Sequence, residues 1–172
     1  RQMCIRDRCI AQLQLRQSQT SEPDIRFITL PSFTAFCQEF KDSDLTKKTE
    51  DLRKTFIEAT KKYQLDTAGK MCTEVFIEST SEGRYVIPVA ADPDTNDEHI
   101  KKLPQTAAIC IYYRGPYENF DTVQKKLLDY AKESNLATCG YFRNSFMEGP
   151  PTHGANKDAY ITQIALPICH LE

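Results

Sequence analysis

The chain is rich in aromatic side chains that could hold a small molecule, with eight tyrosines, nine phenylalanines and no tryptophan. Many of them fall in segments that alternate as strands do. Aromatic faces stack on flat hydrophobic ligands and attract cations, and small-molecule sites are typically apolar with a few polar groups. Core aromatics would look the same in a sequence. The candidates for ligand contact are Tyr113, Tyr117, Tyr141, Phe146 and Tyr160.

Side chains that could bind a metal or act as catalysts are scattered. His99, His153 and His170 lie far apart, in polar loops or near the end of the chain, so we expect no metal site, no cofactor and no Cys–His dyad. The seven cysteines are an odd number and contain no CxxC motif, which predicts reduced, buried thiols. Those in the predicted domain are Cys37, Cys72, Cys110, Cys139 and Cys169.

Length and charge limit the class of protein. The 172 residues carry a net charge of −2 and are 40% hydrophobic and 27% charged, which is typical of one soluble globular domain. Nucleic-acid binding by this segment is disfavoured, because neutralising phosphates needs a basic surface. No apolar run approaches the length of a membrane span. We therefore expect a cytoplasmic protein without membrane contact.

The elements that must position the candidate residues form an internal repeat of two units. Residues 30–35 and 103–108 each contain an apolar entry, a proline and an alternating run. A helix-patterned segment and two strand-patterned segments follow each of them. The last strand of each unit has an apolar-Pro-apolar step, at 87–89 and at 166–168. A repeat of this kind predicts stacked or pseudo-symmetric units.

We therefore expect an α+β domain over 25–172, built from two strand-helix-strand-strand units related by a pseudo-twofold axis. The repeat halves are 25–92 and 100–168, joined by a solvated acidic linker. Their antiparallel sheets are backed by two helices. The first helix is predicted to be capped by Asp42 or Ser43 and to run to about Tyr63, and the second to run from Pro116 to about Ser134. A ligand groove is expected between the halves.

Three motifs carry a resemblance to a known family. They are a Tyr-x-Gly-x-Tyr step into a helix at 113–117, a Tyr-Phe-Arg-x-x-Phe strand at 141–146 and the closing strand at 160–168. In their order and spacing, the chain resembles the GyrI-like effector-binding domains over roughly 25–168. Such domains form the ligand-sensing half of many MerR-type and some AraC-type transcription regulators, multidrug-responsive ones among them. The resemblance implies an aromatic-lined groove that binds small, often amphipathic molecules.

Two positions depart from the family pattern. Many members carry a Glu facing the groove where this chain has Gln163, and a commonly acidic position of the preceding strand is Asn144. An amide offers hydrogen bonds, whereas a carboxylate attracts a cation strongly. The departures predict a neutral or polar ligand, or another acid such as Glu74 or Glu148 in that role. Glu74 either meets the ligand or faces water, and water is the favoured interpretation.

The favoured function is the effector-binding domain of a bacterial transcription regulator, of MerR type rather than AraC type. The parent protein is expected to be a homodimer that contacts DNA only through a missing N-terminal domain. A hydrolase of activated electrophiles would need a carboxylate to activate water, and Gln163 and Asn144 remove the obvious ones. No catalytic residue is therefore expected. The alternatives are a stand-alone GyrI-like binding protein, hydrolytic or not, and a protein-inhibitor binding module.

The first 24 residues are considered separately. Residues 1–8 resemble a peptide that arises when sequencing-adapter read-through is translated, and we expect them to be an artefact. Residues 9–24 are expected to be the remnant of a linker helix and a linker, such as the end of a MerR-type dimerisation helix.

Overall fold

The computed structural model describes residues 24–42 and 44–171, and the predicted artefact and nearly all of the predicted linker remnant lie outside them. The first half contains β1 (Arg26–Leu30), β2 (Phe33–Lys41), α2 (Leu45–Lys62), β3 (Gln64–Leu65), β4 (Cys72–Phe76) and β5 (Glu82–Ala90). The second half begins with β6 (Ile100–Leu103), β7 (Thr106–Arg114), η1 (Tyr117–Asn119) and α3 (Phe120–Glu133). It ends with β8 (Leu136–Thr138), β9 (Tyr141–Glu148), α4 (Pro150–His153), η2 (Lys157–Ala159) and β10 (Ile161–Leu171).

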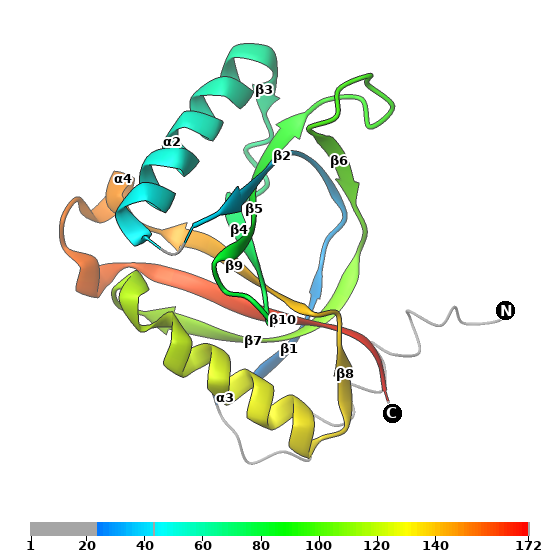
Figure 1. Ribbon diagram of the computed structural model, residues 1–172, viewed down its shortest axis with the longest axis vertical. Coiled ribbons are helices and arrows are strands. Elements are labelled where there is room, and N and C mark those ends of the chain that lie inside the picture. Colours follow the sequence, from blue (N-terminus) through cyan, green and yellow to red (C-terminus); the bar gives the residue numbers. More distant parts are fainter. Residues whose placement is uncertain (1–23, 43, 172) are drawn as a thin grey trace, which may run out of the picture.

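All of these strands join in one antiparallel sheet that curls into a half-barrel (Figure 1). The strand order is β1-β7-β10-β9-β4-β5-β2-β6, with β3 beside β5 and β8 beside β10. The predicted α+β class and the strand-helix-strand-strand order of each half are confirmed. Equivalent strands follow one another in the same order from either edge, which agrees with a duplication. The pseudo-twofold relation itself stays a prediction.

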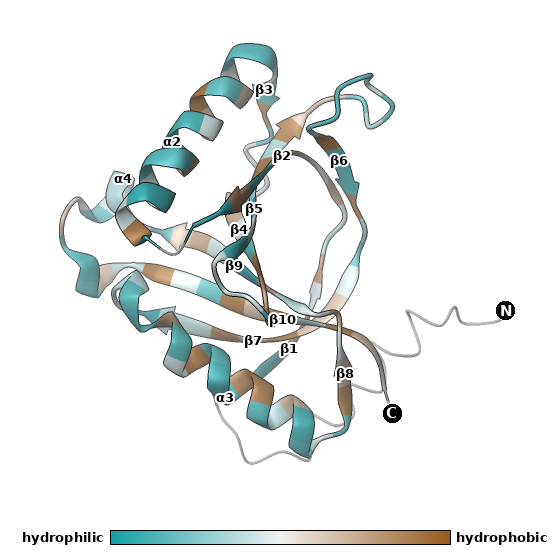
Figure 2. Ribbon diagram, viewed as in Figure 1, coloured by the Kyte–Doolittle hydropathy of each residue, from teal (hydrophilic) through white to brown (hydrophobic). Residues whose placement is uncertain are grey.

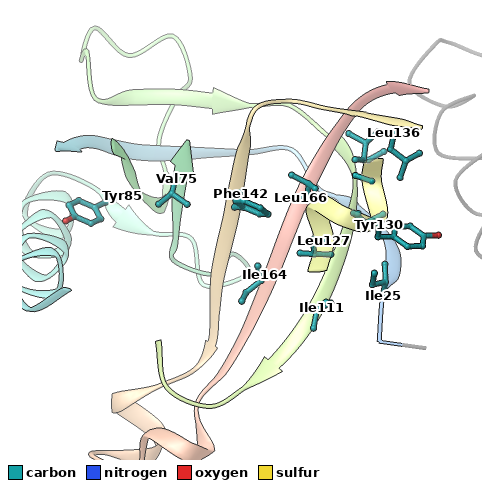
Figure 3. Close-up of a cluster of buried hydrophobic side chains, with 14 of the residues drawn as sticks. Ile25, Val75, Tyr85, Ile111, Leu127, Tyr130, Leu136, Phe142, Ile164 and Leu166 are labelled. Carbon is teal, nitrogen blue, oxygen red and sulfur yellow. The ribbon is translucent and has the colours of Figure 1, made fainter. Parts of the chain in front are cut away.

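Helix α3 packs on one face of the sheet, which we call the helix face. Its apolar side chains join the main buried cluster, and Figure 3 shows that β4, β5, β7, β9 and β10 contribute to the same cluster. In α3 the apolar side chains lie at helical spacing and therefore share the side that faces the sheet. Its residues in or against the cluster include Phe120, Val123, Leu127, Tyr130 and Ala131.

Helix α2 packs on the same face, where Ala59 is buried among Phe36 of β2 and Ile87 of β5. Figure 2 shows hydrophobic residues on the sides of α2 and α3 that face the sheet, and hydrophilic residues on the sides that face away. Leu45 is an exception among the apolar residues of α2, since it is 39% exposed at the first turn. No helix among the described residues is both long and apolar enough to cross a membrane.

The start of α2 differs from the prediction. The helix is capped by Asp44, whose side chain accepts a hydrogen bond from the backbone N–H of Thr46. Asp42 instead accepts a hydrogen bond from the N–H of Asp44. Several residues with capping side chains follow one another here, so the sequence alone did not single out the one that caps.

The cysteines divide into two groups. Cys37, Cys72 and Cys110 are buried free thiols, as predicted. Cys139 and Cys169 form a disulfide with their Cα atoms 5.2 Å apart, so the prediction of reduced thiols is wrong for these two. The cause is the pairing of β8 with β10, whose register shifts next to Cys169. Residues 30 positions apart thereby become neighbours.

Candidate ligand-binding site

Strand alternation divides the candidates for the ligand site, which are the five aromatic residues together with Gln163, Asn144 and Glu74, between the two faces of the sheet. We call the face that lies away from α2 and α3 the opposite face. Tyr113, Tyr117, Asn144, Phe146 and Tyr160 lie on the helix face. Glu74, Tyr141 and Gln163 lie on the opposite face. The structure therefore does not bring the predicted set together at one place, and each residue's contact with a ligand stays a prediction.

On the helix face, four of the predicted residues and Phe120 form one group, which we call the aromatic cluster. Tyr117 lies at its centre, with ring centroids 5.5 Å from Phe120, 5.4 Å from Phe146 and 5.2 Å from Tyr160. Tyr113 meets Phe120 edge-on at 5.9 Å. These separations are those of attractive ring contacts. The cluster joins β7, β9 and β10 to the start of α3.

The turn after β7 places Tyr117 over the sheet. Gly115 adopts φ +142°, and a Cβ at this position would lie 2.6 Å from the hydroxyl oxygen of Tyr113. Its N–H donates to the carbonyl of Tyr160, which ties the turn to the beginning of β10. Pro116 then begins η1 from an extended conformation. The Tyr-x-Gly-x-Tyr motif is thus a turn that brings both of its tyrosines into the aromatic cluster.

Residues 149–159, which we call the 149–159 loop, contact the aromatic cluster through tyrosine hydroxyls. A Cβ at Gly149 would lie 2.9 Å from the Tyr117 hydroxyl oxygen. The Tyr160 hydroxyl donates a hydrogen bond to the carbonyl of Gly154. The loop carries α4 and η2 between the end of β9 and the start of β10 (Figure 1).

Beside the cluster, the sheet carries polar atoms that are buried without partners. Thr162 is 0% exposed and lies in register between Tyr113 and Phe146. Neither its Oγ1 nor the Oδ1 of Asn144 has a hydrogen-bond partner among the described residues. Buried polar atoms are nearly always hydrogen-bonded in folded proteins. These two oxygens therefore mark a place where a bound molecule could supply the missing partner.

Burial sets the protonation of the central tyrosine. It is the main cause that raises the pKa of Tyr117 to about 12, and the neighbouring Tyr160 contributes in the same direction. The hydroxyl of Tyr117 therefore stays protonated at neutral pH and can donate a hydrogen bond.

Two contacts between polar side chains lie at the edge of the aromatic cluster. Glu148, at the end of β9, contacts the Nε2 of His153 through its Oε2 at 2.6 Å. Glu118 of η1 contacts the Nζ of Lys157 at 3.2 Å. Of the two acids predicted as substitutes for the family's Glu, Glu148 is therefore the one that lies beside the cluster.

Glu74 does not face water, which corrects the favoured interpretation of this residue. It is 5% exposed on the opposite face. Its Oε1 accepts from the Nε of Arg84 at 2.6 Å, and its Oε2 accepts from the Nε of Arg143 at 2.9 Å. The physical reason is the register of β4, which places an arginine of β5 and another of β9 directly beside Glu74.

Gln163 is also partnered on the opposite face, where its Nε2 donates to the hydroxyl of Tyr112 at 2.9 Å. Tyr141 lies across from Phe76 on the same face. Two hollows of about 310 Å³ and about 410 Å³ lie along α3, and Tyr113 lines the larger one. Both are lined by residues at the start of the described chain and by residues of the second half, beside α3 rather than beside α2. The position of the predicted groove stays a prediction.

The ligand contacts predicted from the sequence included neither Thr162 nor Phe120. A signal for Thr162 was present in the alternation of the last strand. It is a polar residue in line with Ile164, Leu166 and Ile168, which belong to the main buried cluster. A polar residue among such neighbours needs a partner.

Comparisons with solved structures support the fold. No protein-family model matches the chain, and no curated protein sequence matches it. The C-terminal domain of EcmrR is 15% identical, with a TM-score of 0.71 over 86% of this chain and 98% of the other. EcmrR in a complex with DNA is 16% identical, with a TM-score of 0.74 over 97% of this chain and 68% of the other.

Two further structures share the fold more distantly. SAV2435 bound to tetraphenylphosphonium is 13% identical, with a TM-score of 0.55 over 84% of this chain and 93% of the other. A hydrolase from Listeria innocua is 11% identical, with a TM-score of 0.51 over 91% of this chain and 98% of the other. At such identities the similarity establishes the fold alone. It confirms the fold expected from the resemblance to GyrI-like effector-binding domains.

Proposed function

We propose that this chain is the effector-binding domain of a bacterial transcription regulator and that it binds a small amphipathic or aromatic molecule at the aromatic cluster. The observation that carries the proposal is the hydroxyl of Thr162, which is buried without a partner between Tyr113 and Phe146. A ligand with a flat apolar body and a hydrogen-bonding group would suit both the rings and this hydroxyl.

The regulator context is supported by EcmrR, a MerR-family protein whose C-terminal domain has this fold and which has been solved with DNA. This chain has a net charge of −2, which suits a domain that does not itself hold DNA. We therefore place DNA contact in a separate domain of a homodimeric, cytoplasmic parent protein. A MerR-type parent is favoured over an AraC-type parent.

Ligand entry would require the aromatic cluster to open, because Thr162 is fully buried. The 149–159 loop is the element that can move away from the cluster. It is held by the hydrogen bond from Tyr160 to Gly154 and by the ion pair between Lys157 and Glu118, whose side chains are 60% and 49% exposed. Exposed ion pairs contribute little stability. The ligand would then shift the balance between two arrangements of the regulator by its differential affinity for them.

The charge of the ligand would depend on Glu148. The SAV2435 structure holds tetraphenylphosphonium, a lipophilic cation. In this chain Gln163 offers only an amide and lies on the opposite face, whereas Glu148 lies beside the cluster with His153 as its partner. We therefore propose a ligand that is neutral or carries one positive charge.

We propose binding without catalysis, since Gln163 and Asn144 carry amides that cannot act as general bases. One observation favours the alternative of a stand-alone hydrolase. His153 and Glu148 contact one another at 2.6 Å, an arrangement able to activate water. Turnover of an activated ester that is abolished by His153→Gln would favour that alternative.

The proposal is tested by thermal shift with tetraphenylphosphonium and with triphenylphosphine oxide, a neutral molecule of similar shape. Ligand at about 100 times its dissociation constant adds about 2.7 kcal/mol of stability. We expect at least one compound to stabilise the protein, and Phe146→Leu to remove the effect. Phe76→Leu is the matched control, because Phe76 is 51% exposed on the opposite face. Equal shifts in both variants, or no shift with either compound, would contradict the proposed site.

A further inference from the structure

Three charged residues lie side by side across the middle of the opposite face. Glu74 of β4 is in direct register with Arg84 of β5 and with Arg143 of β9. Each arginine donates its Nε to a different oxygen of the same carboxylate. The side chains of Arg143 and Glu74 are 3% and 6% exposed, and that of Arg84 is 32% exposed.

The group carries an excess of positive charge, because two guanidinium groups share one carboxylate. Each arginine uses its Nε for Glu74, which leaves its Nη donors for other acceptors. Among the described residues, Arg84 has no acceptor besides Glu74, and Arg143 has only Glu74 and the Tyr141 hydroxyl. A buried cation without full compensation is costly. A bound anion would remove that cost.

The surroundings fit an anion with an apolar body. The ring of Phe33 lies 5.6 Å from the Cζ of Arg143. Phe33 packs in turn against a buried cluster on the opposite face, which contains Ala35, Cys37, Cys72, Val86 and Leu103. These side chains are buried, and Phe33, which is only half-buried, is the apolar side chain that they hold beside the arginines.

A third cation adds to the same region. Lys101 of β6 is exposed and lies in register with Ala35. The thiol of Cys37 interacts with Arg84, Lys101 and Arg143 as well as with Glu74. The charges of these four residues act on the thiol, and burial, the largest cause, nevertheless raises its pKa to about 11.

We propose that the opposite face holds a second binding site, for a small molecule that carries a carboxylate or a phosphate group on an apolar body. The anionic group is bound by the Nη donors of Arg84 and Arg143, which suit planar, bidentate recognition. The apolar body lies against Phe33. This site goes beyond the effector site proposed on the helix face and does not depend on it.

The test is calorimetric titration of the whole chain at constant ionic strength with benzoate, benzamide and inorganic phosphate. Benzamide is the neutral counterpart of benzoate. We expect binding of benzoate or of phosphate, and no binding of benzamide. Binding of benzoate alone assigns the site to carboxylates, and binding of phosphate alone assigns it to phosphorylated molecules.

The variant that tests the site is Arg84→Met, because Arg84 is the more exposed of the two arginines and its loss is better tolerated by the fold. We expect the affinity for the anion to fall at least about tenfold, as for a lost charge-assisted hydrogen bond. Arg53→Met is the matched control, since Arg53 is exposed on α2, and it should bind as the unchanged chain does.

Glu74→Gln gives a second test, because it removes the only acid among the three residues and should tighten anion binding. If neither anion binds the folded chain, or if Arg84→Met binds as tightly as Arg53→Met, the proposal is overturned. A thermal shift with tetraphenylphosphonium that persists in Arg84→Met would show that the helix-face site works independently.

Discussion

Thr162 of β10 lies directly across from Phe146 of β9, and its fully buried hydroxyl has no hydrogen-bond partner among the described residues. A partner lost from a buried polar group costs about 1–3 kcal/mol. A well-packed valine of the same shape would avoid this cost. The presence of threonine at this position is explained if a ligand supplies the partner.

Thr162→Val should therefore raise the free energy of unfolding of the unliganded chain by about 1 kcal/mol. The same change should weaken binding of triphenylphosphine oxide, whose oxygen can accept a hydrogen bond from the Thr162 hydroxyl, and should leave binding of tetraphenylphosphonium, which has no hydrogen-bonding group, nearly unchanged. Urea denaturation measures the first effect, and probe titration measures the second.

Thr55→Val provides the control for that variant. Thr55 is 4% exposed, but its hydroxyl donates to the carbonyl of Asp51 at 2.8 Å. This substitution should lower the free energy of unfolding by about 1 kcal/mol, the usual net value of a hydrogen bond. A similar loss in Thr162→Val would mean that its hydroxyl already has a partner, such as a bound water, and that the cluster is ordinary core.

Tyr85→Phe should raise stability and change its dependence on pH. The Tyr85 hydroxyl is buried without a partner among the described residues, and burial is the main cause that raises its pKa to about 12. The unfolded chain loses this proton near pH 10, before the folded chain does. Stability is therefore fully present below about pH 10 and falls as the pH rises towards 12. In Tyr85→Phe the free energy of unfolding should fall less steeply between about pH 10 and 12. If urea denaturation shows the same pH dependence in the variant and in the unchanged chain, Tyr85 is not the group responsible.

Glu148→Gln should reduce the preference of the site for a cationic ligand over a neutral one. Removal of the carboxylate should lower the affinity for tetraphenylphosphonium several-fold, since the attraction acts over a short distance near the protein surface. The affinity for triphenylphosphine oxide should stay the same. Glu78→Gln is the control, because Glu78 is exposed after β4. Equal affinities for the cation in both variants would show that Glu148 does not attract the ligand.

Cysteine labelling should separate the five cysteines of the described chain into two groups. Under native oxidising conditions Cys139 and Cys169 should react with iodoacetamide only after reduction, because they are disulfide-bonded. The three free thiols should react only after unfolding, because burial raises the pKa of Cys37, Cys72 and Cys110. Peptide mapping by mass spectrometry reads out both groups. Labelling of Cys139 without reduction would contradict the disulfide.

The sequence was sufficient for the architecture because its patterns are local. Both long helices and the longer strands have clear periodicity, and the repeat predicted their order in each half. The three short strands β3, β6 and β8 were missed, because two to four residues carry too little pattern to be distinguished from a loop. They form by pairing with β5, β2 and β10.

The candidate site was only partly predictable, because it depends on which face each strand presents. Tyr113 and Phe146 were identified from residue type and motif. Thr162, which lies in register between them in the sheet, was not identified. Glu74 shows the limit more clearly. Its alternation within β4 was recognised, but its two arginine partners lie 10 and 69 positions away. Such contacts are fixed by strand order, which a single sequence does not reveal.

The most direct test of the central claim is a heteronuclear NMR titration of the chain with tetraphenylphosphonium and with triphenylphosphine oxide. If the aromatic cluster is the effector site, the amide signals of Tyr117, Phe146, Thr162 and the 149–159 loop should shift most. Signals of Arg84, Cys72 and Cys37 on the opposite face should stay in place. Shifts concentrated on the opposite face, or no shifts at all at millimolar ligand, would contradict the account.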